Sequence, residues 1–236
     1  MQKAMPAPAN ENCSNCKAEG FFCNLSASAT ADLDAISIKS SYPKGTTLFQ
    51  ENDDPRGLYV LCEGQAKVSM NSSDGKTLIL RIARPGAVLG LTDVLSGNPH
   101  GITVETLHTC RVSFIRREDF LRFLTQHPEA YSNVAHELSS HYHQAREQLR
   151  TMGLAPSISK KLAKLFLDWS ANSTETGRAK KIKVPLTHEE IGEFIGTSRE
   201  TVTRTLSELK HRRLVVMQGA TLTIPDPSAL AMYAGI

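Results

Sequence analysis

A segment near the middle of this 236-residue chain constrains its architecture more than any other feature. Residues 129–152 contain no proline or glycine, and their apolar residues recur at alternating spacings of four and three. This spacing is a heptad seam, which typically packs against a second helix in a coiled coil. It predicts a helix over 128–153 that pairs with its own copy in a homodimer. A helix packed only on its own domain would have the same stripe. The seam residues are Tyr131, Ala135, Leu138, Tyr142, Ala145, Leu149 and Met152.

The rest of the chain divides around this helix. Residues 1–23 form a polar tail that contains three cysteines. Residues 24–127 contain short apolar runs separated by glycines, with an Asp-Gly turn at 74–75, which predicts an antiparallel roll. Residues 154–236 alternate amphipathic helices with short strands. The sequence therefore predicts an α+β chain with these four parts.

Two short helices joined by a tight turn are predicted within 187–210. Thr187 and Glu190 have the spacing of a capping box, which starts a helix. Gly196 ends that helix, and Ser198 caps the next one. A hairpin turning near Gly219 follows. This order predicts a winged helix-turn-helix.

The second helix of this motif has two chemically different faces. Val202, Leu206 and Leu209 fall on one arc of the helix, and the polar residues from Arg199 to Ser207 fall on another. Guanidinium groups match the major-groove edge of guanine, and a carboxylate accepts from cytosine. A solvated helix face with an Arg–Glu pair would show the same pattern. The candidate DNA-binding residues are Thr187, Ser198, Arg199, Glu200, Thr203 and Arg204.

The charge distribution indicates a polyanionic partner of the last part, such as double-stranded DNA, although surface lysines on a solvated module would give the same excess. Residues 154–236 contain 12 Lys and Arg against 8 Asp and Glu, a net charge of +4, whereas residues 1–153 contain 15 against 16. No apolar run is long enough to span a membrane, and no secretory signal opens the chain. We therefore expect a cytoplasmic protein without membrane contact, in which cysteines are free thiols or metal ligands.

The tail cysteines Cys13, Cys16 and Cys23 follow a C-x2-C-x6-C pattern. Such a cluster suits zinc or an iron–sulfur cluster, and either needs a fourth ligand. Cys62 lies in an apolar strand and is expected in the core. We expect no enzyme, because nothing in the sequence sets His100 or His108 beside a cysteine as its base. A partner-binding adaptor without DNA is a further alternative.

From about residue 24 to 230 the chain resembles the CRP/FNR superfamily of bacterial transcription regulators, most closely in "IGEFIGTSRETVTRTLSELK". The resemblance implies a β-roll similar to cupin and cyclic-nucleotide-binding domains, a dimerisation helix and a winged helix-turn-helix. It implies RNA polymerase as a partner. It also implies that Arg199, Glu200 and Arg204 read a TGTGA-like half-site, as in CRP, because the FNR-type motif has Val-Glu-x-x-Ser-Arg here. Two-fold symmetry then implies a near-palindromic operator.

The same resemblance bears on what the roll senses. Cyclic-AMP-binding members have Gly-Glu-Leu-Gly followed by Arg-Ser, whereas this chain has Ala87 and His100–Gly101 at those places. We do not expect a cyclic nucleotide, because its buried phosphate would lack a cation. Cys110 stands where FNR has its fourth cluster cysteine.

Together, Cys13, Cys16, Cys23 and Cys110 resemble the [4Fe–4S] ligands of FNR-type oxygen sensors, although FNR has x5 where this chain has x6. The resemblance implies regulation by redox state or oxygen. Zinc, thiol oxidation without a metal, and a small organic effector in the roll stay open as alternatives.

Overall fold

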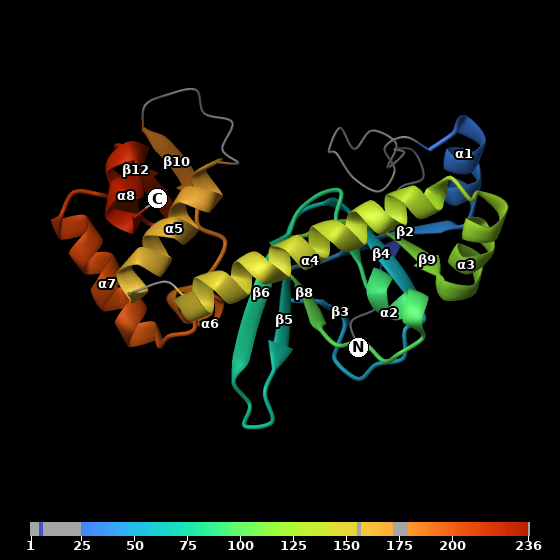
Figure 1. Ribbon diagram of the computed structural model, residues 1–236, viewed down its shortest axis with the longest axis horizontal. Coiled ribbons are helices and arrows are strands. Elements are labelled where there is room, and N and C mark those ends of the chain that lie inside the picture. Colours follow the sequence, from blue (N-terminus) through green and yellow to red (C-terminus); the bar gives the residue numbers. More distant parts are fainter. Residues whose placement is uncertain (1–4, 7–24, 155–156, 172–178, 236) are drawn as a thin grey trace. The chain divides into compact units, whose positions relative to one another are not determined.

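The computed structural model describes residues 5–6, 25–154, 157–171 and 179–235. The chain forms two compact units, Met1–Ala145 and Arg146–Ile236. The division falls inside α4 (Ala130–Leu154), which is one unbroken helix (Figure 1), and so lies N-terminal to the junction expected after residue 153. The last turns of α4 therefore belong to the second unit.

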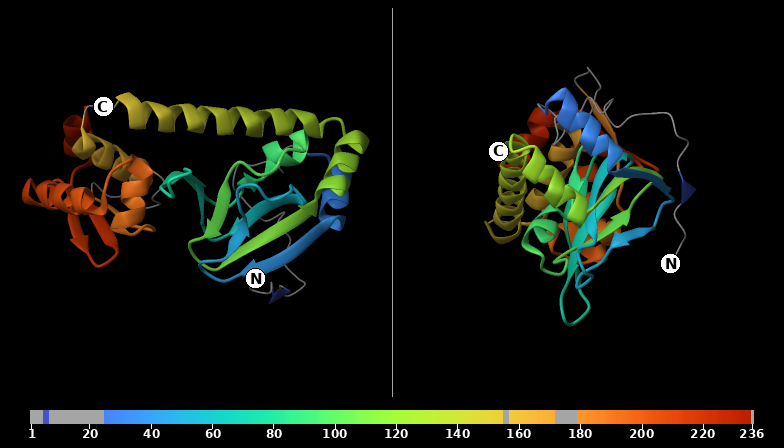
Figure 2. Two further views of the ribbon diagram at one scale, coloured as in Figure 1. Left: turned by 90° about the horizontal axis from the view of Figure 1, so that it is seen from below. Right: turned by 90° about the vertical axis from the view of Figure 1, so that its right-hand side faces the viewer.

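The first unit is a roll of two antiparallel sheets, with helices α1 and α3 beside each other at one end (Figure 2). One sheet has the strand order β1-β2-β9-β4-β7 and the other the order β3-β8-β5-β6. The strands are β1 (Met5–Pro6), β2 (Ser37–Tyr42), β3 (Thr47–Phe49), β4 (Gly57–Glu63), β5 (Ala66–Asn71), β6 (Thr77–Ala83), β7 (Val88–Leu89), β8 (Thr103–Thr106) and β9 (Cys110–Arg116). The helices before α4 are α1 (Ala27–Ala35), α2 (Leu91–Ser96) and α3 (Arg117–Gln126).

Alternation along β4 gives the roll two cores. Leu58 and Val60 pack with Phe120 of α3 and with the buried residues of α1 and α2. Leu61 points the other way and packs with Val112 between the two sheets. Both faces of β4 are buried because side chains alternate along a strand and each sheet face is covered.

Helix α4 is attached to the roll along one side. Ala130 and Val134 are buried in the roll's helix-covered core. About two turns further on, His141 Nε2 lies 3.1 Å from Glu137 Oε1 and 3.2 Å from Arg81 Nη2 of β6. The face of α4 toward the roll is therefore distinct from most of the heptad seam, and only Leu138 of the seam packs against this core.

The second unit is a winged helix-turn-helix. Its three-stranded antiparallel sheet has the order β10-β12-β11, and its core includes Leu162, Phe166, Val202 and Leu222. The predicted α+β class, with a roll followed by a winged helix-turn-helix, is confirmed. The elements are α5 (Ile158–Ala171), β10 (Lys180–Lys183), α6 (His188–Ile195), α7 (Arg199–His211), β11 (Val216–Gln218), β12 (Thr221–Ile224) and α8 (Pro227–Ala234). No helix in the described part of the chain has the length and hydropathy needed to cross a membrane.

Candidate nucleic-acid interface and cysteine site

The helix-turn-helix begins with the predicted capping box. Thr187 Oγ1 accepts a hydrogen bond from Glu190 N at 3.2 Å, and Glu190 Oε2 accepts from Thr187 N at 2.9 Å. This reciprocal pair satisfies two backbone N–H groups that a helix start leaves without partners. The Thr187 hydroxyl is therefore part of the helix cap, although its side chain stays exposed.

The turn between α6 and α7 depends on two glycines. Gly196 ends α6 with φ +72°, a left-handed conformation that favours glycine. A Cβ at Gly192 would lie 2.6 Å from the carbonyl oxygen of Thr197, so only glycine allows α6 to approach the turn this closely. Ser198 then caps α7, with its Oγ accepting from Thr201 N at 3.3 Å. The start of α7 is thus fixed by local contacts.

Helix α7 divides into a buried and an exposed face, as the sequence predicts. Val202 and Leu209 are fully buried, whereas the candidate reading residues are exposed, namely Arg199, Glu200, Thr203 and Arg204. In the part of the chain that the structure describes, no carboxylate oxygen lies within ion-pair distance of the guanidinium of Arg199 or Arg204. The described residues therefore show no close Arg–Glu ion pair here, although the charge of Arg199 helps to lower the pKa of Glu200.

The carboxylate of Glu200 is held in its charged form. Its pKa is lowered, first by a hydrogen bond from its own backbone N–H and then by one from the Ser198 hydroxyl. An ionised carboxylate only accepts hydrogen bonds. At neutral pH, Glu200 can therefore face a donor such as the cytosine amino group, but not another acceptor.

His188 is a residue of this face that the sequence did not single out. Its Nδ1 lies 3.0 Å from Thr203 Oγ1, while the Thr203 hydroxyl lies 3.0 Å from the carbonyl oxygen of Arg199. The pair joins the start of α6 to the exposed face of α7. No sequence signal would reveal it, because the two residues are on different helices and meet only through the turn.

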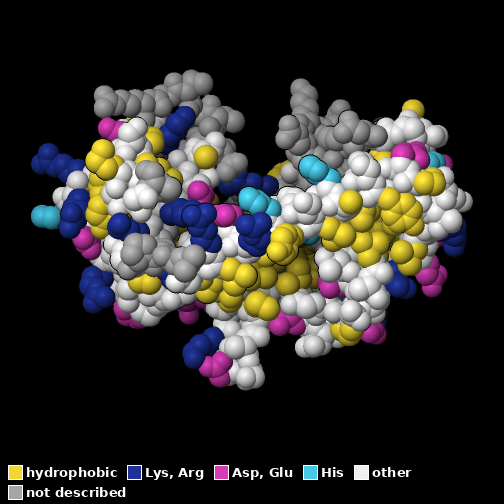
Figure 3. All heavy atoms as spheres, viewed as in Figure 1, with side chains coloured by type: hydrophobic (Ala, Val, Ile, Leu, Met, Phe, Trp, Pro, Cys, Tyr) yellow, Lys and Arg dark blue, Asp and Glu magenta, His cyan; other side chains and the backbone are white. Residues whose placement is uncertain are grey.

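The unit that contains α7 is rich in cations, and a hairpin follows α7 in sequence. Lys and Arg side chains gather over the unit that contains α5 to α8 on the side seen in Figure 3. Strands β11 and β12 pair antiparallel with Gln218 opposite Thr221, and Gly219 has φ +57° in the loop. The hairpin predicted near Gly219 is thus confirmed, and the unit has the form of a winged helix.

The heptad seam is mostly exposed. Tyr131 is 51% exposed, Tyr142 67% and Leu149 70%. Ala135 and Ala145 are also exposed, whereas Leu138 and Met152 are partly buried. A helix packed only on its own domain would cover this stripe. The exposure of large apolar side chains in a row leaves the seam available to a partner.

Only one of the four proposed cluster ligands can be described. Cys13, Cys16 and Cys23 lie outside the described residues. Cys110 begins β9 and is fully buried, with its Sγ 3.2 Å from the carbonyl oxygen of Gln65 and 3.3 Å from that of His108. Burial raises the pKa of the Cys110 thiol. Cys62 is partly exposed in β4 and does not occupy the core position expected for it.

The acceptor carbonyls around Cys110 suit a thiol that donates a hydrogen bond. A metal ligand must be a thiolate. The position of Cys110 therefore does not fit ligation as it stands. Among the described residues no group of three or more His, Cys, Asp or Glu side chains is arranged to hold a metal ion.

The positions that correspond to the ribose-binding and phosphate-binding residues of the cyclic-AMP subgroup hold different chemistry here. Ala87 packs against the core between the sheets. His100 is buried, and its Nδ1 lies 2.8 Å from Asp93 Oδ2. The Asp93 carboxylate beside this imidazole would repel a phosphate.

Comparison with known proteins places both units in recognised domain families. Residues 39–127 match the cyclic nucleotide-binding domain, and residues 160–233 match the Crp-like helix-turn-helix domain. A "CRP-like cAMP-activated global transcriptional regulator" of Mycobacterium tuberculosis is 26% identical over 91% of this chain and 96% of that protein. The "Nitrogen fixation regulation protein FixK" of Bradyrhizobium diazoefficiens is 24% identical over 98% of this chain and 97% of that protein.

Solved structures show the same fold. FixK2 from Bradyrhizobium japonicum superposes with a TM-score of 0.74 at 20% identity, covering 84% of this chain and 96% of that one. A roll followed by a winged helix-turn-helix defines the class of DNA-binding transcription regulators. Within that class, the chain belongs to the CRP/FNR family. The Mycobacterium protein is named as a transcriptional regulator, and FixK is named as a nitrogen fixation regulation protein.

Proposed function

We propose that this CRP/FNR-type regulator binds a near-palindromic operator as a homodimer and reads each half-site with Arg199, Glu200 and Arg204. The observation that carries the proposal is the exposed start of α7. There, two guanidinium groups without ion-pair partners flank a carboxylate held in its charged form. Fork-shaped donors fit guanine, and the carboxylate fits cytosine, so the set favours G·C pairs.

Thr203, Ser198 and Thr187 have supporting roles in this proposal. Ser198 and Thr187 cap α7 and α6, and so fix the angle at which α7 is presented. Thr203 lies between Arg199 and His188 on the exposed face. Exposed hydroxyls near helix starts also suit contacts to phosphate, which position a protein without selecting sequence. RNA polymerase as a partner stays a prediction from the family resemblance.

Selection from a random duplex pool tests this reading directly. The full-length protein should enrich a palindrome whose half-sites are about one helical turn apart. Affinity for the enriched duplex should fall with salt at a slope near −0.9 per phosphate contacted. A pool that stays random after selection would contradict sequence reading. Salt-independent binding to a protein partner would instead favour the adaptor alternative.

We further propose regulation by redox state or oxygen through a [4Fe–4S] cluster held by Cys13, Cys16, Cys23 and Cys110. The support is the spacing of the tail cysteines and the FNR-like place of Cys110 in the sequence. The Cys110 sulfur would have to leave the Gln65 and His108 carbonyls and lose its proton to become a ligand. This requirement weighs against the cluster and favours the alternatives without a metal, which are thiol oxidation and a small organic effector.

Anaerobic purification with iron and sulfide assays separates these alternatives. The cluster proposal predicts about four iron and four sulfide per protomer, lost on exposure to air. Cys110→Ala should lose iron, whereas Ser113→Ala, its control at a buried position of the same strand, should keep it. Zinc in place of iron would favour a structural metal site. Protein without metal in both variants and in the parent would exclude the cluster and favour thiol oxidation or an organic effector.

A further inference from the structure

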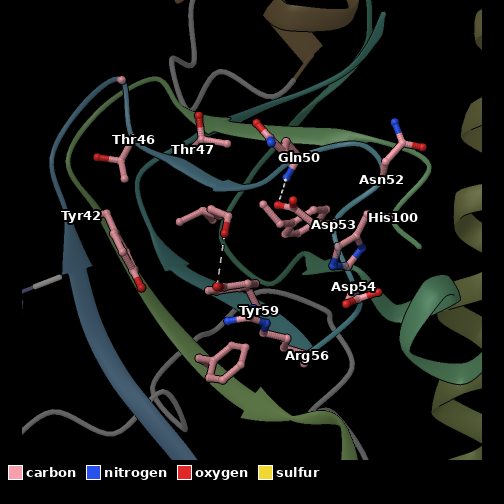
Figure 4. Close-up of a pocket in the computed structure, with 15 residues that line it drawn as sticks. Tyr42, Thr46, Thr47, Gln50, Asn52, Asp53, Asp54, Arg56, Tyr59 and His100 are labelled. Atoms are coloured by element: carbon pink, nitrogen blue, oxygen red, sulfur yellow. Dashed lines mark hydrogen bonds between the residues drawn. The ribbon is translucent and has the colours of Figure 1, made fainter. Parts of the chain in front are cut away.

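A cavity of about 1450 Å³ opens into the roll beside β3 (Figure 4). Side chains from both sheets and the loop before β4 line it. Most prominent are Tyr42 of β2, Phe49 of β3, Tyr59 of β4 and Phe114 of β9. The cavity is separate from α7 and does not include Cys110 or any other cysteine among its described lining residues. Neither the DNA-reading proposal nor the cluster proposal uses it.

The aromatic rings of this cavity are in contact with one another. The ring centroids of Tyr59 and Phe114 are 4.8 Å apart, those of Phe49 and Tyr59 are 5.9 Å apart, and those of Phe49 and His100 are 3.9 Å apart. The Phe49–His100 pair is stacked. A continuous aromatic wall of this kind favours a planar ring as the occupant.

His100 supplies one directed polar group to the wall. Its side chain is 2% exposed, and its Nδ1 is 2.8 Å from the Asp93 carboxylate. A carboxylate only accepts, so Nδ1 carries the hydrogen, and in the neutral imidazole Nε2 keeps its lone pair. Nε2 has no hydrogen-bond partner among the described residues. Every side-chain nitrogen or oxygen of the buried and partly buried residues in the described chain either has a hydrogen-bond partner or touches solvent. The unpaired Nε2 therefore touches solvent. Because His100 lines the cavity, Nε2 is the ring nitrogen that reaches it.

The charges around the cavity select against an anion. The charged residues that line the cavity are Asp53, Asp54 and Arg56. The formal charge of the lining is therefore negative when His100 is neutral. Asp53 also accepts a hydrogen bond from Gln50 N at 3.0 Å, which keeps its carboxylate at the rim. A phosphate or carboxylate ligand would be repelled there.

We propose that this cavity binds an uncharged aromatic molecule with a hydroxyl group, a phenol, whose O–H donates to His100 Nε2 while its ring packs against Tyr42 and Tyr59. The inference gives the organic-effector alternative a site and a ligand class. It is tested by direct binding to the full-length protein, so its failure is distinguishable from failure of DNA reading.

The test measures dissociation constants of phenol, anisole and benzoate by ligand-detected NMR titration. Anisole has the same ring without the donor, and benzoate replaces the donor with an anion. Phenol should bind about tenfold more tightly than anisole, the value of one well-made hydrogen bond. Benzoate should bind more weakly than phenol. Equal affinity for phenol and anisole, tighter binding of benzoate, or no phenol binding would overturn the proposal.

Two variants assign the two parts of the site. His100→Phe keeps a ring against Phe49 and should abolish the preference for phenol over anisole. Tyr42→Ala, at the end of β2, should weaken phenol and anisole by a similar factor and leave the preference intact. His108→Phe, an exposed histidine outside the cavity, is the matched control and should change neither. If His100→Phe does not fold, an unchanged preference in Tyr42→Ala with weaker binding of both ligands still supports the site. Unchanged affinity in Tyr42→Ala overturns it.

Discussion

Gln148 Nε2, near the end of α4, donates a hydrogen bond of 2.8 Å to the carbonyl oxygen of Phe194, in the last turn of α6. Carbonyls at a helix C-terminus have no partner within the helix, so Gln148 caps α6 from outside. Close by, Lys161 Nζ donates to Met152 O at 2.7 Å, and a Cβ at Gly196 would lie 3.3 Å from Met152 Cε. The end of the proposed dimer helix is therefore fixed to the turn that precedes α7.

This connection predicts that Gln148 influences DNA binding without touching DNA. Gln148→Ala removes the hydrogen bond to Phe194 O, which contributes about 0.5–1.5 kcal/mol to stability, and should loosen the α6–α7 turn. We expect faster hydrogen exchange over residues 193–198 and weaker operator binding. Gln144→Ala is the control, because Gln144 donates only to Ser140 Oγ one turn earlier on the same helix. Equal exchange in both variants would mean that α4 does not hold the turn.

Arg199→Ala should relax sequence preference at one base pair in each half-site. Loss of a bidentate guanine contact costs about 1–3 kcal/mol of discrimination at that pair, with little change at other positions. Binding to a set of single-substitution operators measures this. Lys210→Ala, on an exposed lysine near the other end of α7, should weaken all operators alike. Full discrimination by Arg199→Ala would contradict the assignment.

Charge on the seam should prevent dimerisation. Leu149→Glu places a carboxylate on an exposed apolar seam position, where pairing with a second copy would bury it unpaired. Sedimentation should show a monomer with weak operator binding. His136→Glu, an exposed position off the seam, should leave the dimer intact. A dimeric Leu149→Glu protein would mean that the subunits meet elsewhere.

The Tyr59 phenol should ionise late in an alkaline titration. Burial, and then the neighbouring Tyr42, raise the pKa of Tyr59 to about 12, and its hydroxyl donates to Leu48 O at 3.3 Å. The pKa of Tyr59 in the folded protein exceeds its unfolded value of about 10, so the protonated phenol stabilises the folded state. This contribution to the free energy of unfolding is fully present below pH ~10 and is lost as the pH rises toward 12.

Tyrosine absorbance after rapid pH jumps should therefore contain a component near pH 12. Tyr59→Phe should lack that component, and Tyr142→Phe should retain it. If the titration of Tyr59→Phe matches that of the parent protein, the phenol is not buried in solution.

Local sequence signals predicted the elements well. The capping box at Thr187, the glycine end at Gly196 and the apolar arc through Val202 each depend on residues within a few positions of one another, and each appears as expected. Periodicity also predicted the helix over 128–153, although its bounds are Ala130–Leu154.

Contacts between distant residues were beyond the sequence. His188–Thr203, Gln148–Phe194 and Asp93–His100 each need a turn or a sheet to bring their partners together. The division of the chain inside α4 could not be read either, because a continuous helix carries no local signal of which unit its ends pack against. These tertiary contacts connect the end of α4 to the helix-turn-helix and form part of the candidate effector site.

Photocrosslinking from α7 in the operator complex tests the central claim most directly. A photoreactive amino acid at position 203 should crosslink to bases within each half-site, whereas the same group at position 232, on exposed Met232 of α8, should not. Crosslinks from 203 confined to the sugar–phosphate backbone, or found only from 232, would contradict the claim that the start of α7 reads the bases.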